Sequence, residues 1–142
     1  MAVVVFDADV VIAFLAHGDA QHTEAVERIR RSFAADTRRL ICAVNYSEVL
    51  VGPLEKRGRA GAELVDDMFV RFGVETIQVD MDLARRAAAV KARTALRLPD
   101  AYALATAIHA EKRGWPNVRL ESFDKKLLAA YKALHPFDAD LN

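Results

Sequence analysis

The sequence predicts an α/β domain with a central, mostly parallel β-sheet flanked by α-helices. Three observations predict this fold class. Short apolar runs alternate along the chain with segments of helical periodicity, the pattern of a parallel α/β sheet. A length of 142 residues fits one domain, expected to span residues 1–142. A hydrophobic fraction of 53% with 28% charged residues is typical of a chain that buries a core.

The first elements follow from apolar spacing near the N-terminus. Residues 3–6 form a continuous apolar run, as expected of a strand buried on both faces. Asp19 is expected to cap a helix, because Val26, Ile29 and Phe33 recur at helical spacing behind it.

The middle of the chain repeats this order. Residues 40–44 are a second apolar run and predict a second strand, and Asn45 begins a helical stretch that ends at about Arg57. Residues 60–72 predict a further helix with one apolar stripe, most simply a core face, and Gly73 ends it. The stripe consists of Val65, Met68, Phe69 and Phe72.

The remaining elements continue the alternation to the end of the chain. Strands are predicted at residues 74–79 and 118–123. A helix rich in Ala and Arg is predicted at residues 82–95. Another is predicted from Pro99 to Gly114, since proline is favoured in a first helical turn. The last helix is predicted from Lys125 to a point before Pro136.

Charge and cysteine content exclude several classes of protein. Twenty basic and twenty acidic residues balance, which argues against binding to DNA or a membrane through bulk positive charge. The single cysteine excludes an internal disulfide framework and a cysteine-based zinc site. The longest apolar stretch is far too short for a membrane helix. The apolar N-terminus has no basic leader and contains Asp7 and Asp9, so we expect a cytoplasmic protein.

Four acidic residues are expected at one edge of the sheet. Asp7 directly follows the first strand, and Asp124 follows the fourth. Glu48 and Asp100 lie in the first turns of helices that begin at the same edge, where parallel sheets bind their ligands. No basic side chain is evident as a common partner. Carboxylates gathered in one cleft repel unless a cation neutralises them, and Mg²⁺ with oxygen ligands would do so and activate water for attack at phosphorus.

Each of the four acids also has a purely structural interpretation. Asn45 and Glu48 match the spacing of a capping box. Asp100 after Pro99 is a common first-turn acid, and Asp7 and Asp124 can each cap a helix. Taken singly, each fits a cap better than a site. A cap, however, needs only Ser, Thr or Asn, whereas this chain uses an acid at all four places.

Four segments carry a resemblance to a known family, the PIN-domain ribonucleases that form the toxin half of bacterial VapBC toxin–antitoxin pairs. The segments are VVFDADVVIA at residues 4–13, YSEVL at 46–50, RLPDAYALATA at 97–107 and SFD at 122–124. The third segment is the most specific. Their order and spacing resemble the family over essentially the whole chain.

The resemblance implies a metal-dependent endoribonuclease that uses an acidic quartet. Asp7 and Asp100 would be direct Mg²⁺ ligands, with Mn²⁺ as an alternative ion, and Glu48 and Asp124 would hold waters or a second ion. Ser122 would take the place of a threonine that hydrogen-bonds within the site. The chain departs from the family pattern at Asp9, which stands where Ser or Asn is common and is therefore a supporting candidate.

The resemblance also implies partners. Without the quartet, twenty basic and sixteen acidic residues remain, a net charge of +4, and Arg97 and Lys125 are candidates for contacts to RNA phosphates. These cations can equally belong to solvated helix faces. A VapB-like antitoxin would neutralise the toxin and meet part of the helix at residues 60–72, and the assembly would be a homodimer or a toxin–antitoxin hetero-oligomer.

Two other functions compete with the nuclease. The segment from Asp7 to Asp9 also fits the opening of haloacid-dehalogenase-like phosphatases, with Asp7 as nucleophile. That family needs a later lysine and a paired-acid motif at a strand end, whereas Asp66 and Asp67 lie within a predicted helix. A non-catalytic PIN-like binding module is the second rival, and the intact quartet speaks against it.

Overall fold

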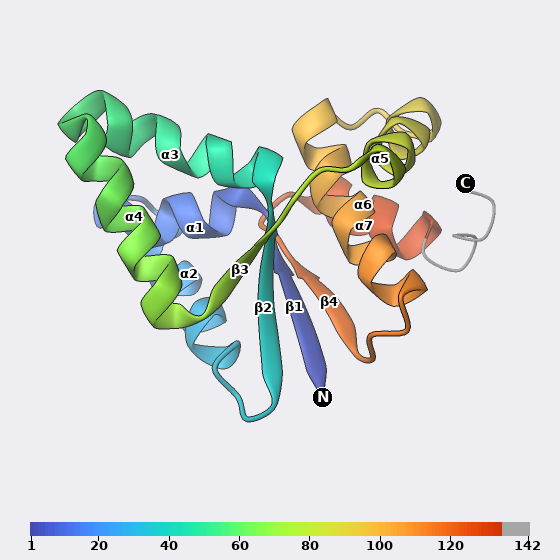
Figure 1. The fold of residues 1–142 in the computed structure, drawn as a ribbon, viewed down its shortest axis with the longest axis horizontal. Coiled ribbons are helices and arrows are strands. Elements are labelled where there is room, and N and C mark those ends of the chain that lie inside the picture. Colours follow the sequence, from blue (N-terminus) through green and yellow to red (C-terminus); the bar gives the residue numbers. More distant parts are fainter. Residues whose placement is uncertain (135–142) are drawn as a thin grey trace.

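A computed structural model describes residues 1–134 and places a parallel sheet between two groups of helices (Figure 1). Within these residues the sheet has four strands in the order β3-β2-β1-β4, each pair parallel. The strands are β1 (Ala2–Phe6), β2 (Thr37–Cys42), β3 (Val74–Ile77) and β4 (Val118–Glu121). The parallel α/β fold expected from the sequence is therefore confirmed.

Helices cover both faces of the sheet. Helices α1 to α4 lie on one side, and α5 to α7 lie on the other (Figure 1). Their bounds are α1 (Ala8–Leu15), α2 (His22–Arg31), α3 (Ala43–Arg57), α4 (Arg59–Phe72), α5 (Met81–Arg93), α6 (Leu98–Lys112) and α7 (Lys125–Leu134). None of the described helices is long and apolar enough to cross a membrane.

Strand β1 lies inside the sheet and joins two hydrophobic cores. Val3 and Val5 pack into the core beneath α5, α6 and α7, and Val4 and Phe6 pack into the core beneath α1 to α4. All four side chains are at most 1% exposed. The continuous apolar run in the sequence exists because both faces of this strand are buried.

Several element boundaries differ from those expected. Helix α2 begins at His22, three residues after Asp19, whose side chain accepts from the backbone of Gln21. The second strand ends at Cys42, so α3 begins two residues before Asn45. The two remaining strands each end two residues early, at Ile77 and Glu121.

Helix ends on the α5–α7 side follow local capping. Asp80 caps α5 by accepting a hydrogen bond from the Leu83 backbone N–H at 2.8 Å, which places the start of α5 one residue before the expected position. Helix α6 begins with Leu98 and Pro99. The predicted end of the last helix, before Pro136, lies outside the described residues.

Two glycines shape the packing of α4 against α3 and the turn from α4 into β3. Gly73 ends α4 with a φ of 65°, a left-handed conformation that favours glycine. A Cβ on Gly61 would lie 2.2 Å from the carbonyl oxygen of Pro53, so α3 and α4 approach closely because residue 61 has no side chain. The apolar stripe of α4 faces the core as expected, with Val65, Met68 and Phe69 buried.

Candidate active site

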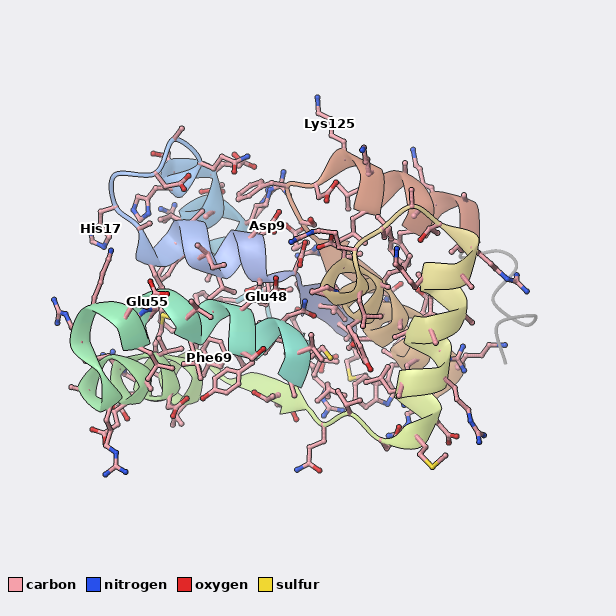
Figure 2. The ribbon with its side chains drawn as sticks, turned by 90° about the horizontal axis from the view of Figure 1, so that it is seen from above. Asp9, His17, Glu48, Glu55, Phe69 and Lys125 are labelled. Atoms are coloured by element: carbon pink, nitrogen blue, oxygen red, sulfur yellow. The ribbon has the colours of Figure 1, made fainter. Side chains whose placement is uncertain are left out.

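The four predicted acids all lie above the carboxyl edge of the sheet. Asp7 follows β1 and caps α1, where its Oδ1 accepts from the Ala8 backbone N–H at 2.8 Å. Asp124 lies after β4 and accepts from the first backbone N–H groups of α7. Glu48 is on α3, and Asp100 is in the first turn of α6. Figure 2 looks down on this edge and shows Asp9 and Glu48 near its middle.

Asp7 and Asp9 share the hydroxyl group of Ser122. Ser122 Oγ lies 2.8 Å from Asp7 Oδ2 and 3.2 Å from Asp9 Oδ2, and it also accepts from the Asp124 backbone N–H at 3.0 Å. The Phe123 N–H donates to Asp9 Oδ2 at 2.9 Å. One hydroxyl proton cannot satisfy two carboxylates at once. The turn after β4 therefore ties Asp7, the cap of α1, to Asp9 within α1, while leaving their negative charge under-compensated.

The carboxyl group of Asp7 is difficult to ionise in this setting. It is 3% exposed, and this burial is the main reason that its pKa rises from 3.8 to about 7. The neighbouring charges of Asp9 and Asp100 raise it further, against the opposing hydrogen bond from Ser122. Burial also raises the pKa of Asp9, with a contribution from Asp124. The acids of three separate segments thus share one electrostatic environment.

Glu48 is oriented by a buried asparagine. Asn45 Nδ2 donates to Glu48 Oε1 at 3.1 Å and to the Pro99 carbonyl oxygen at 3.0 Å. Asn45 is fully buried, and it lies inside α3, whose cap is Cys42. The capping-box interpretation is therefore wrong, because Asn45 binds a side chain and another helix instead of free N–H groups. In the sequence, the spacing between Asn45 and Glu48 was the signal that these two side chains could meet.

Asp100 forms an ion pair with Arg97. The Arg97 Nε lies 3.3 Å from one oxygen of Asp100, and its terminal nitrogen lies 3.4 Å from the other. The Arg97 side chain is 73% exposed, whereas that of Asp100 is 8% exposed. Asp100 first, and then Glu48 and Asp7, raise the pKa of Arg97. Arg97, the residue before α6, is thus a partner of one acid, Asp100, and is not hydrogen-bonded to the other three.

The other expected RNA contact, Lys125, is placed differently. Lys125 is the first residue of α7, and its exposed side chain points outward from the helix (Figure 2). Hydrogen bonds join Asp7, Asp9, Ser122 and Asp124. The charge of Asp100 acts on Asp7, and Asn45 links Glu48 to the Pro99 carbonyl next to Asp100. Lys125 remains outside this set.

The arrangement fits a hard divalent cation without forming a closed cage. Among residues 1–134, no three His, Cys, Asp or Glu side chains are close enough to make a ready metal cluster. Mg²⁺ usually keeps several waters and needs few carboxylates. Within the same residues, Asp9 Oδ1 and Asn45 Oδ1 are buried without a hydrogen-bond partner. The free carboxylate oxygen of Asp9 is of the ligand type that suits such an ion.

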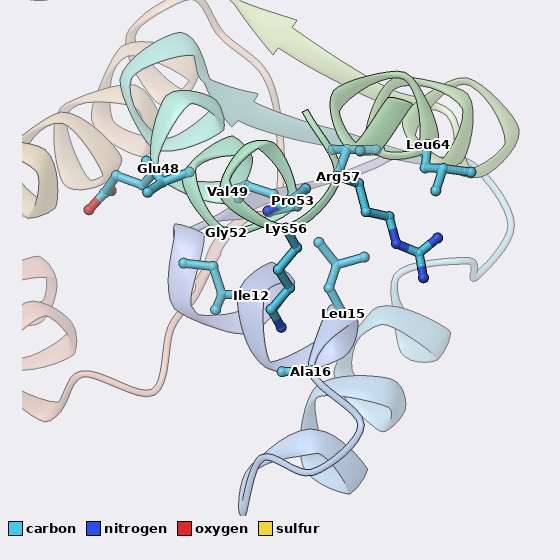
Figure 3. Close-up of a pocket in the computed structure, with 13 residues that line it drawn as sticks. Ile12, Leu15, Ala16, Glu48, Val49, Gly52, Pro53, Lys56, Arg57 and Leu64 are labelled. Carbon is cyan, nitrogen blue, oxygen red and sulfur yellow. The ribbon is translucent and has the colours of Figure 1, made fainter. Parts of the chain in front are cut away.

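An apolar groove of about 540 Å³ lies beside the acids, between α1, α3 and α4 (Figure 3). Ile12 and Leu15 form one wall, and Leu64 closes the far end. Lys56 and Arg57 add positive charge, and Glu48 belongs to the lining. Of the four acids, only Glu48 lines the groove, so the apolar surface borders the acidic site at that residue.

Comparisons with known proteins identify the family of this chain. The sequence-family model of the PIN domain matches residues 4–134. The chain therefore belongs to the PIN-domain family. No curated protein matches the chain.

Three solved structures of similar fold are toxins or toxin–antitoxin complexes. The VapC20 toxin of Mycobacterium tuberculosis, which cleaves the sarcin-ricin loop, is 22% identical over 89% of this chain and 94% of that chain, with a TM-score of 0.67. A toxin–antitoxin complex from Klebsiella pneumoniae is 25% identical over 89% and 90% of the two chains, with a TM-score of 0.59. VapBC2 of Rickettsia felis, bound to a DNA fragment from its promoter, is 12% identical over 86% and 99%, with a TM-score of 0.54.

The raised pKa of Asp7 predicts a pH dependence of stability. Between about pH 4 and pH 7 the native state keeps the Asp7 proton that the unfolded chain has lost, so the free energy of unfolding should fall as the pH rises. The fall should be on the order of 2–4 kcal/mol, since one pKa unit is worth about 1.4 kcal/mol. Asp7→Asn should remove most of it. Thermal melts in EDTA from pH 4 to pH 8 measure both proteins.

An exposed acid provides the control for this measurement. Asp67→Asn on α4 should leave the pH dependence of the wild type unchanged. Parallel melting curves for Asp7→Asn and wild type would contradict the assignment of the titration to Asp7.

Proposed function

We propose that the chain is a metal-dependent endoribonuclease of the VapC toxin type, which hydrolyses RNA phosphodiester bonds. The observation that carries the proposal is the gathering of Asp7, Glu48, Asp100 and Asp124 above one sheet edge, with the charge of Asp7 under-compensated. Membership of the PIN-domain family and the VapC and VapBC neighbours support it. An RNA substrate would place the activity in the cytoplasm.

In this proposal the acids divide into two roles. Asp7 and Asp100 would hold Mg²⁺ or Mn²⁺ directly, and Glu48 and Asp124 would hold waters or a second ion. Such an ion lowers the pKa of a bound water and stabilises the oxygens of an in-line displacement at phosphorus. Ser122 would keep Asp7 and Asp9 in place, and Asn45 would keep Glu48 turned toward Asp100.

Arg97 would serve two partners in succession. Its ion pair with Asp100 is long, and the Arg97 side chain is 73% exposed, so solvent screens the pair on the arginine side. A divalent ion at Asp100 can therefore displace the guanidinium at little cost. Once released, Arg97 would lie within reach of an RNA phosphate at the entrance of the site, since guanidinium groups bind phosphate oxygens well.

The two rival functions have less support. Asp66 and Asp67 lie within α4, and Asp66 accepts a hydrogen bond from Tyr46, so neither belongs to a paired-acid motif at a strand end as the phosphatase needs. A non-catalytic binding module would not require four acids held by separate partners.

We further propose that a VapB-like antitoxin occupies the groove between α1, α3 and α4. Its apolar walls suit the apolar face of a helix, and Lys56 and Arg57 suit acidic residues beside that face. Because Glu48 lines the same groove, a segment bound there would reach the acidic site and block RNA. The toxin could form a homodimer or a hetero-oligomer around this contact.

Metal and acid removal test the nuclease directly. EDTA should abolish RNA cleavage, and added Mg²⁺ or Mn²⁺ should restore it. Asp100→Asn keeps the size of the side chain but removes a ligand, so cleavage should fall by at least about 100-fold, more than the loss of an outer partner of a metal ligand costs. Asp67→Asn serves as the control and should cleave like the wild type. Full cleavage in EDTA, or hydrolysis of small phosphomonoesters instead of RNA, would overturn the assignment.

If Arg97 competes with the ion and also binds RNA, its removal should strengthen metal binding and weaken RNA binding. Arg97→Met should lower the Mn²⁺ concentration that gives half of the thermal stabilisation by about two- to fivefold, because an exposed ion pair no longer competes. The same variant should cleave RNA with a higher KM. Arg71→Met on α4 removes the same charge elsewhere and should change neither quantity. An unchanged Mn²⁺ midpoint would exclude the competition.

If the groove binds the antitoxin, a substitution there should weaken antitoxin binding without affecting RNA cleavage. Leu64 is 54% exposed and lines the groove, whereas Val70 on the same helix is 81% exposed and does not. Leu64→Asp should weaken co-purification with the co-expressed antitoxin and leave cleavage by the free toxin unchanged, because a charge enters an apolar contact. Val70→Asp should retain the antitoxin. Equal retention by both variants would remove the groove from the interface.

A further inference from the structure

The turn after β4 is held from two sides. Ser122, Phe123 and Asp124 form it, and its inner side is bound by Asp7 and Asp9 through the Ser122 hydroxyl and the Phe123 N–H. Its outer side is bound by Arg28, a residue of α2. Arg28 Nη1 donates to the carbonyl oxygen of Ser122 at 2.8 Å.

Arg28 makes three further contacts that fix its own position. Its guanidinium lies 4.7 Å from the centre of the Phe123 ring, within the range of a cation–π contact. Its Nε donates to Glu24 one helical turn away at 3.1 Å, and Nη1 lies 3.8 Å from Glu121. The Arg28 side chain is 23% exposed. A planar fork that donates on two sides and stacks on a ring is suited to hold a turn in one place.

We propose that Arg28 is a positioning residue for the turn that carries Ser122 and Asp124. Helix α2 contributes none of the four acids, yet through Arg28 it contacts two groups of the turn, the Ser122 backbone carbonyl and the Phe123 side-chain ring. Without this restraint the Ser122 end of the turn is held by Asp7 and Asp9 through one shared hydroxyl proton and one N–H, while Asp124 stays fixed to α7. The inference rests on the proposed nuclease for its kinetic consequence, but its structural consequence is independent of any activity.

The structural consequence is measured by amide hydrogen exchange on the full chain without metal or RNA. Arg28→Met keeps the length and the apolar stem but loses the hydrogen bond and the charge, so exchange at Phe123 and Asp124 should speed up at least about tenfold. The core amides of β1 should keep the wild-type rate. Arg28→Lys keeps a donor for Ser122 and should fall between the two. Arg31→Met, an exposed partner of the same Glu24, should match the wild type.

The kinetic consequence follows from displacement of the turn. Misplacement of reacting groups by about 1 Å can cost about 100-fold in rate, so Arg28→Met should lower kcat for RNA about 10- to 100-fold with KM within about twofold. Arg28→Lys should recover part of kcat, and Arg31→Met should leave both parameters unchanged.

Each outcome decides the matter. Faster exchange confined to Phe123 and Asp124 supports the positioning role even if the chain cleaves no RNA, and a nuclease failure is then seen separately in the wild type. Unchanged exchange at these amides, or an equal rise in Arg31→Met, overturns it. A uniform rise across β1 would assign Arg28 to overall stability and would likewise overturn it. A rise in KM with unchanged kcat would make Arg28 an RNA contact instead.

Discussion

The burial of the Asp7 carboxyl group at the end of β1 is the constraint on which the site depends. Asp7 follows β1, which lies inside the sheet and is packed on both faces, and its own side chain is buried. A buried carboxyl group needs hydrogen bonds or positive charge. The structure supplies the Ala8 N–H and the Ser122 hydroxyl, and the raised pKa shows that these do not suffice. The remaining deficit is what a divalent cation would satisfy.

Several partners hold the other acids, and two of the contacts join separate segments. Asn45 joins Glu48 on α3 to the start of α6, and Arg97 holds Asp100 within that start. Ser122 joins the turn after β4 to α1. The two groups of helices lie on opposite faces of the sheet (Figure 1), and these contacts join them above its edge. The site is therefore a junction between the two cores, which makes its geometry sensitive to the packing of both.

Two different surfaces border the acidic site. The groove between α1, α3 and α4 reaches the acids at Glu48, on the face that carries the apolar and basic surface. Asp100 comes from the opposite face, where Arg97 is exposed to solvent at the entrance. A protein bound in the groove and an RNA strand approaching Arg97 would thus come from different sides of one cluster of acids. An antitoxin bound in the groove as proposed would meet the acids at Glu48.

The sequence by itself determined the alternation of elements, the core face of α4 and the four acids at the carboxyl edge. Apolar periodicity and residue type are local signals, and a parallel sheet brings every strand end to one edge. The tertiary structure alone decided which groups satisfy those acids. Asn45 binds the Pro99 carbonyl 54 positions away, and Arg28 binds the Ser122 carbonyl 94 positions away. Periodicity carries no trace of such pairs, because a buried polar group takes whichever partner the packing of other elements brings within hydrogen-bond distance.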